Sequence, residues 1–264
     1  MVEDLQGKVI MITGASSGLG KQLAMDAAKR GATVVLLARS TDKLKEITRG
    51  ITELTGRLAY YETLHVDDSE QVNEVFLRII SDIGVPDVLI NNAGFAVFDN
   101  LVDADMLEIK EMLNVNVLGV ITCTKAVLPF MLERKKGHII NIASQAGKIA
   151  TPKSSVYAAT KHAVLGLTNS LRLELSGTNI IVTAVNPGPI QTAFFERADK
   201  SGTYVKNVGK LMLSVEDVSG RVINLIVRPK RELNLPWWMS AATTLYQIAP
   251  VFVEKVAGKK FHQK

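Results

Sequence analysis

The hydrophobic positions along the chain fall into short apolar runs that alternate with longer amphipathic stretches. The short runs are rich in β-branched residues, which favours strands, and they occupy residues 8–13, 33–37, 58–65, 87–91, 138–143, 180–186 and 231–235. The longer stretches predict helices at about 18–30, 41–55, 69–83, 103–118, 120–134 and 154–176. Each helix is long enough to connect two parallel strands, so the pattern predicts a series of βαβ units.

Several predicted strands are apolar at successive positions, as in Val9-Ile10-Met11-Ile12, so both of their faces must be covered. We therefore predict an α/β fold, a Rossmann-like doubly wound parallel sheet in a single domain. The domain covers residues 1–235, and residues 236–264 form an apolar and basic C-terminal helical extension. Over about 188–214 the pattern loosens into a loop-helix region that we expect to be a substrate lid.

Composition and charge narrow the class of protein. A chain of 264 residues that is 47% hydrophobic can bury the core of one large domain. The net charge of +5 comes from scattered basic residues, which we interpret as a solvated surface without a nucleic-acid partner. The single Cys123 fits a reducing compartment, and no signal peptide is expected, so we expect a cytoplasmic protein. The four histidines lack metal-ligand spacing, so no metal site is expected.

A glycine-rich turn, TGASSGLG, lies directly between the first predicted strand and the first predicted helix. Its glycines allow a tight turn and close approach of the backbone, and the helix N-terminus attracts a pyrophosphate. An ordinary strand-to-helix turn is the alternative, because glycine triplets also occur without a ligand. The residues that we expect to contact a dinucleotide here are Gly14, Ser16, Ser17, Gly18, Leu19 and Gly20.

The end of the second predicted strand carries a basic residue close to where NAD enzymes usually carry an acid. Ala38 cannot bind a ribose 2′-hydroxyl, whereas Arg39 offers a planar cation to a 2′-phosphate and Ser40 adds a hydroxyl. The alternative is an exposed arginine in front of a helix N-cap. We expect NADP(H) as the cofactor in preference to NAD(H).

A tyrosine and a lysine one helical turn apart form the candidate catalytic pair. Tyr157 and Lys161 are spaced i, i+4, so on a helix both side chains lie on one face. Bringing a phenol from a pKa near 10 to neutrality requires about 4 kcal/mol, which one cation about 4 Å away supplies at an effective dielectric of about 20. Ser144, at the end of an apolar strand, can hold a substrate carbonyl, and capping of a loop is its alternative role.

Five further motifs follow in order: NNAG at 91–94, NVNVLG at 114–119, IINIASQAG at 139–147, YAATK at 157–161 and NPGPIQT at 186–192. With the TGxxxGxG turn they resemble the non-extended branch of the short-chain dehydrogenase/reductase family, over residues 8–228. The resemblance implies a catalytic set of Asn116, Ser144, Tyr157 and Lys161. In that set the lysine also binds the nicotinamide ribose, and the asparagine orients a water behind the lysine. The further cofactor contacts that it implies are Asn91, Ala93, Gly94, Pro187, Gly188, Ile190 and Thr192.

Three assignments within this resemblance stay open. Asn116 could equally be a structural amide that ties a strand to a helix. Where the family usually has an aspartate for the adenine edge, the chain has His65, with Asp67 two residues later, and we favour Asp67. The substrate pocket that the resemblance implies is largely apolar, which favours an apolar carbonyl compound, although packing of the lid against the core is the alternative. The pocket residues are Phe95, Ser144, Gln145, Tyr157 and Phe194.

The expected reaction is reversible hydride transfer between the nicotinamide and a carbonyl or alcohol group, with Tyr157 moving the proton. A 3-oxoacyl-carrier-protein-type reductase is one alternative, and a non-catalytic nucleotide-binding sensor is another. The family resemblance also implies a homodimer or homotetramer.

An uncharged stretch from Leu233 to Val253 departs from the family, whose members usually end soon after the last strand. Two prolines and several polar side chains argue against a membrane span. The stretch could cover the pocket, form a dimer contact, or bind a membrane surface peripherally with Lys255, Lys259 and Lys260 beside it.

Overall fold

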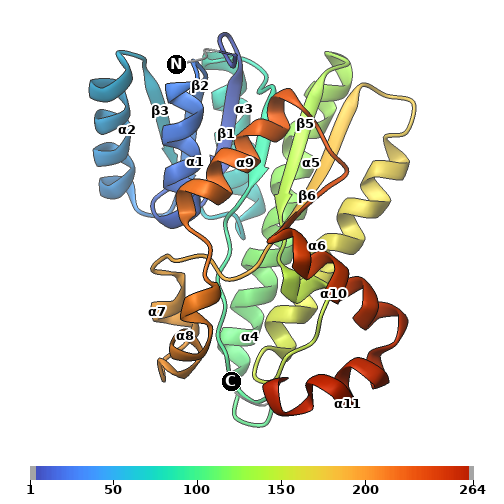
Figure 1. Cartoon of the computed structure of the whole chain (residues 1–264). Coiled ribbons are helices and arrows are strands. Elements are labelled where there is room, and N and C mark those ends of the chain that lie inside the picture. Colours follow the sequence, from blue (N-terminus) through green and yellow to red (C-terminus); the bar gives the residue numbers. More distant parts are fainter. Residues whose placement is uncertain (1–3, 262–264) are drawn as a thin grey trace.

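The computed structural model describes residues 4–261 and contains a seven-stranded sheet in which all strands are parallel (Figure 1). The strand order is β3-β2-β1-β4-β5-β6-β7. The chain adds β2 and β3 on one side of β1 and then adds β4 to β7 on the other side, so the order of the strands reverses between β1 and β4. The predicted Rossmann-like, doubly wound sheet in a single domain is confirmed. The strands are β1 (Val9–Thr13), β2 (Thr33–Ala38), β3 (Ala59–Thr63), β4 (Val88–Asn91), β5 (Gly137–Ile142), β6 (Ile180–Pro187) and β7 (Glu232–Leu235).

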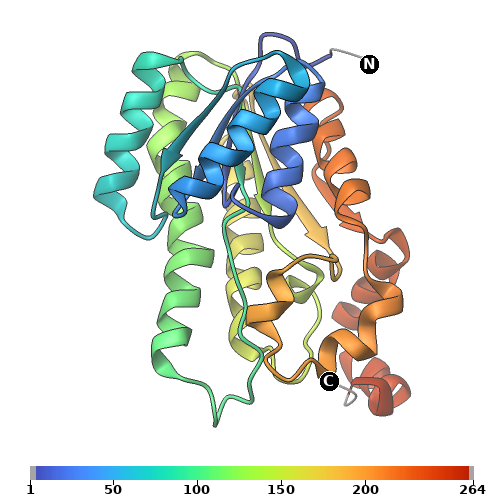
Figure 2. The same cartoon turned by 90° about the vertical axis from the view of Figure 1, so that its left-hand side faces the viewer.

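Two helical layers cover the two faces of the sheet (Figures 1 and 2). In β1, Ile10 and Ile12 pack toward one layer and Met11 packs toward the other. The strand is apolar at every position because each of its faces meets helices. One layer contains α1 (Gly18–Lys29), α2 (Thr41–Thr55) and α9 (Val215–Val227), and the other contains α3 (Ser69–Asp82), α5 (Gly119–Glu133) and α6 (Ser155–Glu174).

The helices predicted separately at 103–118 and 120–134 are one continuous helix, Met106–Glu133. It consists of α4 (Met106–Leu113), the π-helical turn η1 (Asn114–Leu118) and α5. The predicted break was wrong because Gly119 keeps helical backbone angles, and a Cβ at this glycine would lie 2.7 Å from Cγ2 of Val66. Gly119 therefore allows close packing, while the π-helical turn is a type of irregularity that concentrates at functional sites.

Two further groups of helices lie beyond the carboxyl ends of the strands (Figures 1 and 2). The predicted lid contains α7 (Phe194–Ala198), α8 (Thr203–Val208) and the 3-10 turn η3 (Gly209–Leu211). After β7, the chain forms α10 (Trp237–Ile248) and α11 (Pro250–Phe261). Ligands of open α/β sheets bind outside the carboxyl ends of the strands, so both groups surround the expected site.

Among the described residues, one helix is long and apolar enough to cross a membrane by length and composition, and it is the continuous helix Met106–Glu133. Its residues Cys123, Val127 and Met131 are fully buried in the core layer shared with α3 and α6. These contacts are those of a core helix in a globular domain.

Candidate active site

A large cleft of about 950 Å³ opens at the carboxyl ends of the strands, beside the reversal point between β1 and β4. The structure brings the glycine turn, the tyrosine–lysine pair and the lid loop together around it. The predicted residues that line the cleft are Gly14, Ser16, Ser17, Gly18, Leu19, Gly20, Arg39, Ser40, Asp67, Ala93, Gly94, Phe95, Ser144, Gln145, Tyr157, Lys161, Pro187, Gly188, Ile190, Thr192 and Phe194. Two predicted residues, Asn91 and Asn116, lie behind its wall.

The glycine turn is held against the end of β4 by close backbone contacts. Gly14 has φ +65°, and a Cβ there would lie 2.8 Å from Cα of Ala93. A Cβ at Gly20 would lie 2.3 Å from the Gly14 carbonyl oxygen. The side-chain amide of Asn92 donates to the carbonyls of Thr13 at 2.9 Å and Gly14 at 3.2 Å. Asn92 is a residue that the sequence analysis missed as a cleft residue, although the NNAG motif contains it.

The N-terminus of α1 lies at the cleft. Ser17 is the N-cap without a side-chain capping bond, and the first turn of the helix has no acidic residue. Both Ser17 and Gly18 line the cleft. The first N–H groups of a helix have no partner within the helix and form the positive end of its dipole. This part of the cleft is therefore suited to a phosphate group.

Two basic residues lie where the cleft meets β2 and α2. Arg39 lines the cleft beside Ser40, and its Nη1 is 3.7 Å from Oε1 of Glu111. Lys43, in the first turn of α2, also lines the cleft. Lys43 was missed, although its position four residues after Arg39 was an available signal. Two cations and a hydroxyl can donate charge-assisted hydrogen bonds to a phosphate group.

Asp67 and His65, the two candidates for the adenine edge, differ in position. Asp67 lines the cleft. His65 is exposed, does not line the cleft, and its backbone N–H donates to Oε1 of Gln71 at 2.7 Å. Asp67 is therefore the candidate that the geometry supports.

Asn91 ties neighbouring elements together beneath the cleft. Its side chain is 2% exposed, and Nδ2 donates to Oδ1 of Asn141 at 2.8 Å and to Oγ1 of Thr124 at 3.0 Å. The side chain thus joins β4 to β5 and α5. Ala93 and Gly94, which follow it, line the cleft instead.

Tyr157 and Lys161 lie one turn apart on α6, and both line the cleft as their spacing predicted. Nζ of Lys161 is 5.7 Å from the centroid of the Tyr157 ring and donates to the Ile142 carbonyl at 2.9 Å. Ser144 follows β5, and its Oγ accepts from the backbone N–H of Ala146 at 3.0 Å. Ser144 also hydrogen-bonds the Tyr157 side chain. The hydroxyls and the ammonium group therefore share one wall.

Burial governs the protonation of this pair. It raises the pKa of Tyr157 well above its ordinary value of 10, while the hydrogen bond from Ser144 opposes the rise. Burial also lowers the pKa of Lys161 from 10.5 to about 8. Burial of the phenol therefore opposes the lowering of its pKa that we expected from the lysine.

Asn116 lies in the π-helical turn and is fully buried. Its Oδ1 accepts from the backbone N–H of Phe95 at 3.0 Å, and its Nδ2 donates to the Phe95 carbonyl at 2.8 Å and to Oγ1 of Thr160 at 3.2 Å. A Cβ at Gly94 would lie 3.0 Å from this Oδ1 and 3.7 Å from Nζ of Lys161. The amide therefore ties the NNAG loop to α6, directly behind the lysine.

Aromatic side chains surround Tyr157 at the lid end of the cleft. The rings of Phe98 and Phe194 each lie with their centroid 6.0 Å from that of Tyr157. Four further residues line the cleft that no local sequence pattern predicted, because tertiary packing alone brings them here: Phe98, Tyr204, Trp238 and Met239. Gln145 lines the cleft, but its Nε2 donates to the Asn186 carbonyl at 2.8 Å. This end of the cleft is suited to an apolar ligand.

The loop after β6 is joined to the start of α10. The backbone N–H of Gly188 donates to the Leu235 carbonyl at 2.7 Å, and a Cβ at Gly188 would lie 3.2 Å from Sδ of Met239. On the other side of the cleft, Thr192 packs against Gly18, where a Cβ would be 3.4 Å from Thr192 Cβ. The loop therefore connects the glycine turn with the C-terminal helices.

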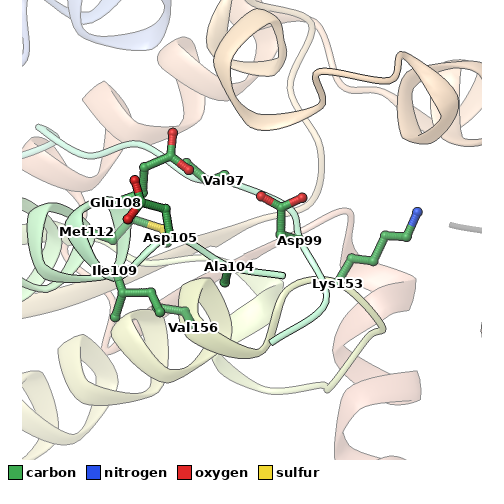
Figure 3. A pocket seen from close by; sticks show the side chains of 9 residues that line it. All are labelled: Val97, Asp99, Ala104, Asp105, Glu108, Ile109, Met112, Lys153 and Val156. Atoms are coloured by element: carbon green, nitrogen blue, oxygen red, sulfur yellow. The ribbon is translucent and has the colours of Figure 1, made fainter. Parts of the chain in front are cut away.

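A second, much smaller cavity lies between the start of α4 and the start of α6 (Figure 3). Its space of about 10 Å³ is enough for about one water molecule. Asp99, Asp105 and Glu108 line it together with Lys153. Among the described residues, no group of three or more His, Cys, Asp or Glu side chains is arranged to hold a metal ion. The large cleft is therefore the candidate site for a ligand.

Comparison with known proteins places the chain in one family. Residues 8–202 match the family model of the short chain dehydrogenases. The dehydrogenase/reductase SDR family protein 7-like of Anopheles gambiae is 36% identical over 258 residues, which cover 93% of this chain and 80% of that protein. The 3-oxoacyl-[acyl-carrier-protein] reductase FabG of Thermotoga maritima is 38% identical over 198 residues, which cover 73% of this chain and 78% of that protein.

Solved structures agree with these matches. A short-chain dehydrogenase from Sphingobium yanoikuyae in complex with NADPH has a TM-score of 0.81 and 27% sequence identity, and the match covers 94% of this chain and 95% of that one. The motifs, the sheet, the tyrosine–lysine pair in the cleft and the match over residues 8–202 lead to the same conclusion. This chain belongs to the short-chain dehydrogenase/reductase family.

Proposed function

We propose that the protein is an NADP(H)-dependent oxidoreductase that transfers hydride reversibly between a nicotinamide and the carbonyl or alcohol group of an apolar substrate. The observation that carries the proposal is the presence of Ser144, Tyr157 and Lys161 on one wall of a cleft that also contains the glycine turn. Family membership supports the oxidoreductase class.

The residues of the cleft fit a nicotinamide dinucleotide with a 2′-phosphate. The N-terminus of α1 would hold the pyrophosphate, and Arg39, Ser40 and Lys43 supply the donors for the 2′-phosphate. Thr192 and Lys161 would hold the nicotinamide end. When bound, the reduced cofactor supplies the hydride and the oxidised cofactor accepts it. The NADPH in the Sphingobium yanoikuyae relative supports the same cofactor class.

The protein's own groups move the proton and position the carbonyl. Because burial raises the pKa of Tyr157, the phenol is protonated at neutral pH and can donate its proton to a carbonyl oxygen. Ser144 lies beside that phenol and can hold the same oxygen. Asn116 and its bonds to Phe95 fix the loop behind Lys161. We infer that the protonated phenol favours catalysis in the direction of carbonyl reduction, in which it acts as the acid.

The test is NADPH consumption, followed at 340 nm, against a panel of apolar aldehydes, ketones and acyl thioesters. We expect turnover with an apolar carbonyl compound, and Tyr157→Phe should lower kcat by about 10²- to 10⁴-fold because it removes the proton donor. Tyr60→Phe, on an exposed tyrosine of β3, is the matched control and should keep full activity. Undiminished turnover by Tyr157→Phe would rule out the assigned proton donor.

A second candidate function is reduction of a 3-oxoacyl chain bound to a carrier protein. The net charge of +5 would attract an acidic carrier, and the 38% identity to the Thermotoga maritima reductase favours the same chemistry. In the panel, this function predicts that carrier-bound 3-oxoacyl thioesters are reduced with a higher kcat/KM than free ketones. A preference for free ketones would exclude it.

A non-catalytic nucleotide sensor is the remaining alternative. It predicts NADPH binding without consumption for every compound in the panel, and equal behaviour of the protein and Tyr157→Phe. The burial of both a phenol and an ammonium group beside the cleft argues against it, because such burial is unfavourable and a sensor gains nothing from it.

We also propose a homodimer or homotetramer in the cytoplasm, with the family resemblance and the thiol chemistry as support. Cys123 is buried, and burial raises the pKa of its thiol to about 12, so it is an unreactive core residue suited to a reducing compartment. Light scattering of the purified protein measures the oligomer, and imaging of the tagged chain measures the location.

A further inference from the structure

The outer side of the two C-terminal helices is apolar and exposed. Trp237 is 80% exposed, Ile248 76% and Val256 73%, which are high values for residues of this kind. We call the group the C-terminal apolar surface, and define it as Trp237, Leu245, Ile248, Val251, Phe252 and Val256. Both views show α10 and α11 at the outer edge of the molecule, at the end toward which the strands point (Figures 1 and 2).

The surface belongs to an amphipathic pair of helices. Within α10, Trp237, Leu245 and Ile248 are separated by eight and three residues, so they lie on one side of the helix. On its other side, Thr243 is buried and Met239 lines the cleft. Trp238, which is 44% exposed and also lines the cleft, lies at the border of the apolar side, next to Leu245. The apolar side is therefore directed away from the fold, and a packing role in the core does not explain it.

Positive charge accompanies this apolar side. From residue 237 to residue 264 the sequence contains four lysines and a single acidic residue, Glu254, which gives a net charge of +3. Lys255, four residues after Val251, is exposed within the same helix. Tryptophan at the boundary, aliphatic side chains and lysines together are the composition of helices that lie in the interface of an anionic bilayer.

We propose that the C-terminal apolar surface docks α10 and α11 onto an anionic lipid bilayer, in the plane of the interface. Each helix has 12 residues, shorter than the roughly 20 residues that a span requires, and Pro250 begins the second helix. A second copy of the chain is a poorer occupant, because a symmetric contact would bring two segments of net charge +3 together. Anionic headgroups complement that charge, which contributes about 1 kcal/mol for each lysine near the surface.

Docking in this orientation places the membrane beside the cleft. Met239 lines the cleft from the inner side of the same helix whose outer side would contact lipid, and Trp238 lines it from the border between the two sides. An apolar carbonyl compound dissolved in the bilayer would then have a short route to Tyr157. This last step depends on the proposed function, whereas the docking itself does not.

Vesicle co-sedimentation of the full chain tests the docking without any assay of turnover. We expect binding to vesicles of phosphatidylcholine mixed with phosphatidylserine. The affinity for vesicles of phosphatidylcholine alone should be lower by about tenfold or more. The double variant Ile248→Ser/Phe252→Ser should lower the affinity for the mixed vesicles about tenfold or more, because two apolar side chains no longer enter the interface. Lys255→Glu should weaken binding to mixed vesicles and leave binding to neutral vesicles unchanged.

The matched control is Leu54→Ser/Leu58→Ser, which removes two exposed leucines at the α2–β3 side of the molecule. It should bind vesicles as the unchanged chain does. The proposal is overturned if the unchanged chain stays in the supernatant, or if both double variants bind equally well. A third result would also overturn it. If the unchanged chain does not bind vesicles, and light scattering shows that Ile248→Ser/Phe252→Ser converts an oligomer to a monomer while the leucine control does not, then a second copy of the chain covers this surface.

Discussion

At Lys161, an ammonium group is held almost wholly out of water. The described contacts give it one acceptor, the Ile142 carbonyl, and burial lowers its pKa from 10.5 to about 8. A lowered pKa of a base means that the unfolded chain binds its proton more tightly than the folded chain. Stability therefore falls as the pH decreases from 10.5 to 8, and at pH 7 the whole unfavourable contribution of about 3 kcal/mol is present.

Lys161→Met should accordingly raise the melting temperature at pH 7 by several degrees while it abolishes turnover. This increase in melting temperature should be smaller at pH 10, because the buried lysine is then mostly neutral in the folded protein and destabilises it less. Thermal unfolding at both pH values measures it, with the exposed Lys45→Met as the control that changes little. A lower melting temperature at pH 7 would show that the contact with Ile142 outweighs the burial of the charge.

Arg39 is the residue on which the cofactor preference depends. Replacing it in Arg39→Asp should weaken NADPH binding by about 10- to 100-fold, because a charge-assisted hydrogen bond to the 2′-phosphate is lost and a like charge is introduced. NADH affinity should stay the same or rise. Fluorescence titration with both nucleotides measures the change, and Arg49→Asp, at an exposed arginine of α2, is the control. Equal losses for both nucleotides would remove the basis for NADP(H).

The turn between β1 and α1 is the element with the least space for change. Gly20→Ala places a methyl group 2.3 Å from the Gly14 carbonyl oxygen, so the turn must shift away from β4. NADPH binding should fall to below detection, as titration would reveal. Gly50→Ala is the matched change in α2, where a Cβ meets nothing within 4 Å, and it should stabilise the protein by about 0.5–1 kcal/mol. Normal NADPH affinity in Gly20→Ala would mean that this turn does not hold the cofactor.

Strand β5 carries a histidine that should make the fold sensitive to acid. His138 is buried, its Nε2 is 2.8 Å from Oγ1 of Thr183, and burial together with the charge of Lys8 lowers its pKa to about 4. The unfolded chain takes up a proton near pH 6.5 and the folded chain does not, so stability is lost as the pH falls from 6.5 to 4.

His138→Gln should flatten this loss, because glutamine has no proton to gain. Urea midpoints at pH 7 and pH 5 measure it, and His162→Gln, at an exposed histidine on α6, should leave the loss unchanged. A fall in the midpoint of His138→Gln as steep as that of the parent would assign the acid sensitivity to another group.

At the scale of elements, local patterns were sufficient where each strand or helix has its own periodicity. All seven strands were anticipated, and the inner ones, such as β1 and β4, are apolar on both faces. The predicted break at Gly119 was wrong, because the sequence alone does not distinguish a glycine that ends a helix from a glycine that allows close packing, here against Val66. Helix α9 was not separated from the loosened pattern after residue 187, although its Val218, Val222 and Ile226 pack against the core.

The residues of the site also fall into those that local sequence signals predict and those that only the tertiary structure reveals. Turn, strand-end and i, i+4 signals are local, and they located Gly14, Arg39, Ser144, Tyr157 and Lys161 in the cleft. The rest depends on which distant segments meet, as with the aromatic residues of the lid and the inner side of α10. Protonation was also beyond reach, because the pKa of a phenol depends on how much water the fold removes from it.

At the scale of the whole molecule, ligand binding should couple the two ends of the cleft. Thr192 lies against Gly18, so a nucleotide held at the α1 N-terminus also meets the loop that leads into the lid. At a concentration 100 times its dissociation constant, NADPH should stabilise the protein by about 2.7 kcal/mol. Thermal unfolding with NADPH checks this, and limited proteolysis should show slower cutting within residues 188–214. A melting temperature indifferent to NADPH would argue against binding in this cleft.

The backbone N–H of Gly188 donates to the Leu235 carbonyl, and Gly188 lies close to Met239. These contacts join the loop that borders the cleft to the start of α10. A displacement of α10 should therefore also shift the loop at Gly188 that lines the cleft.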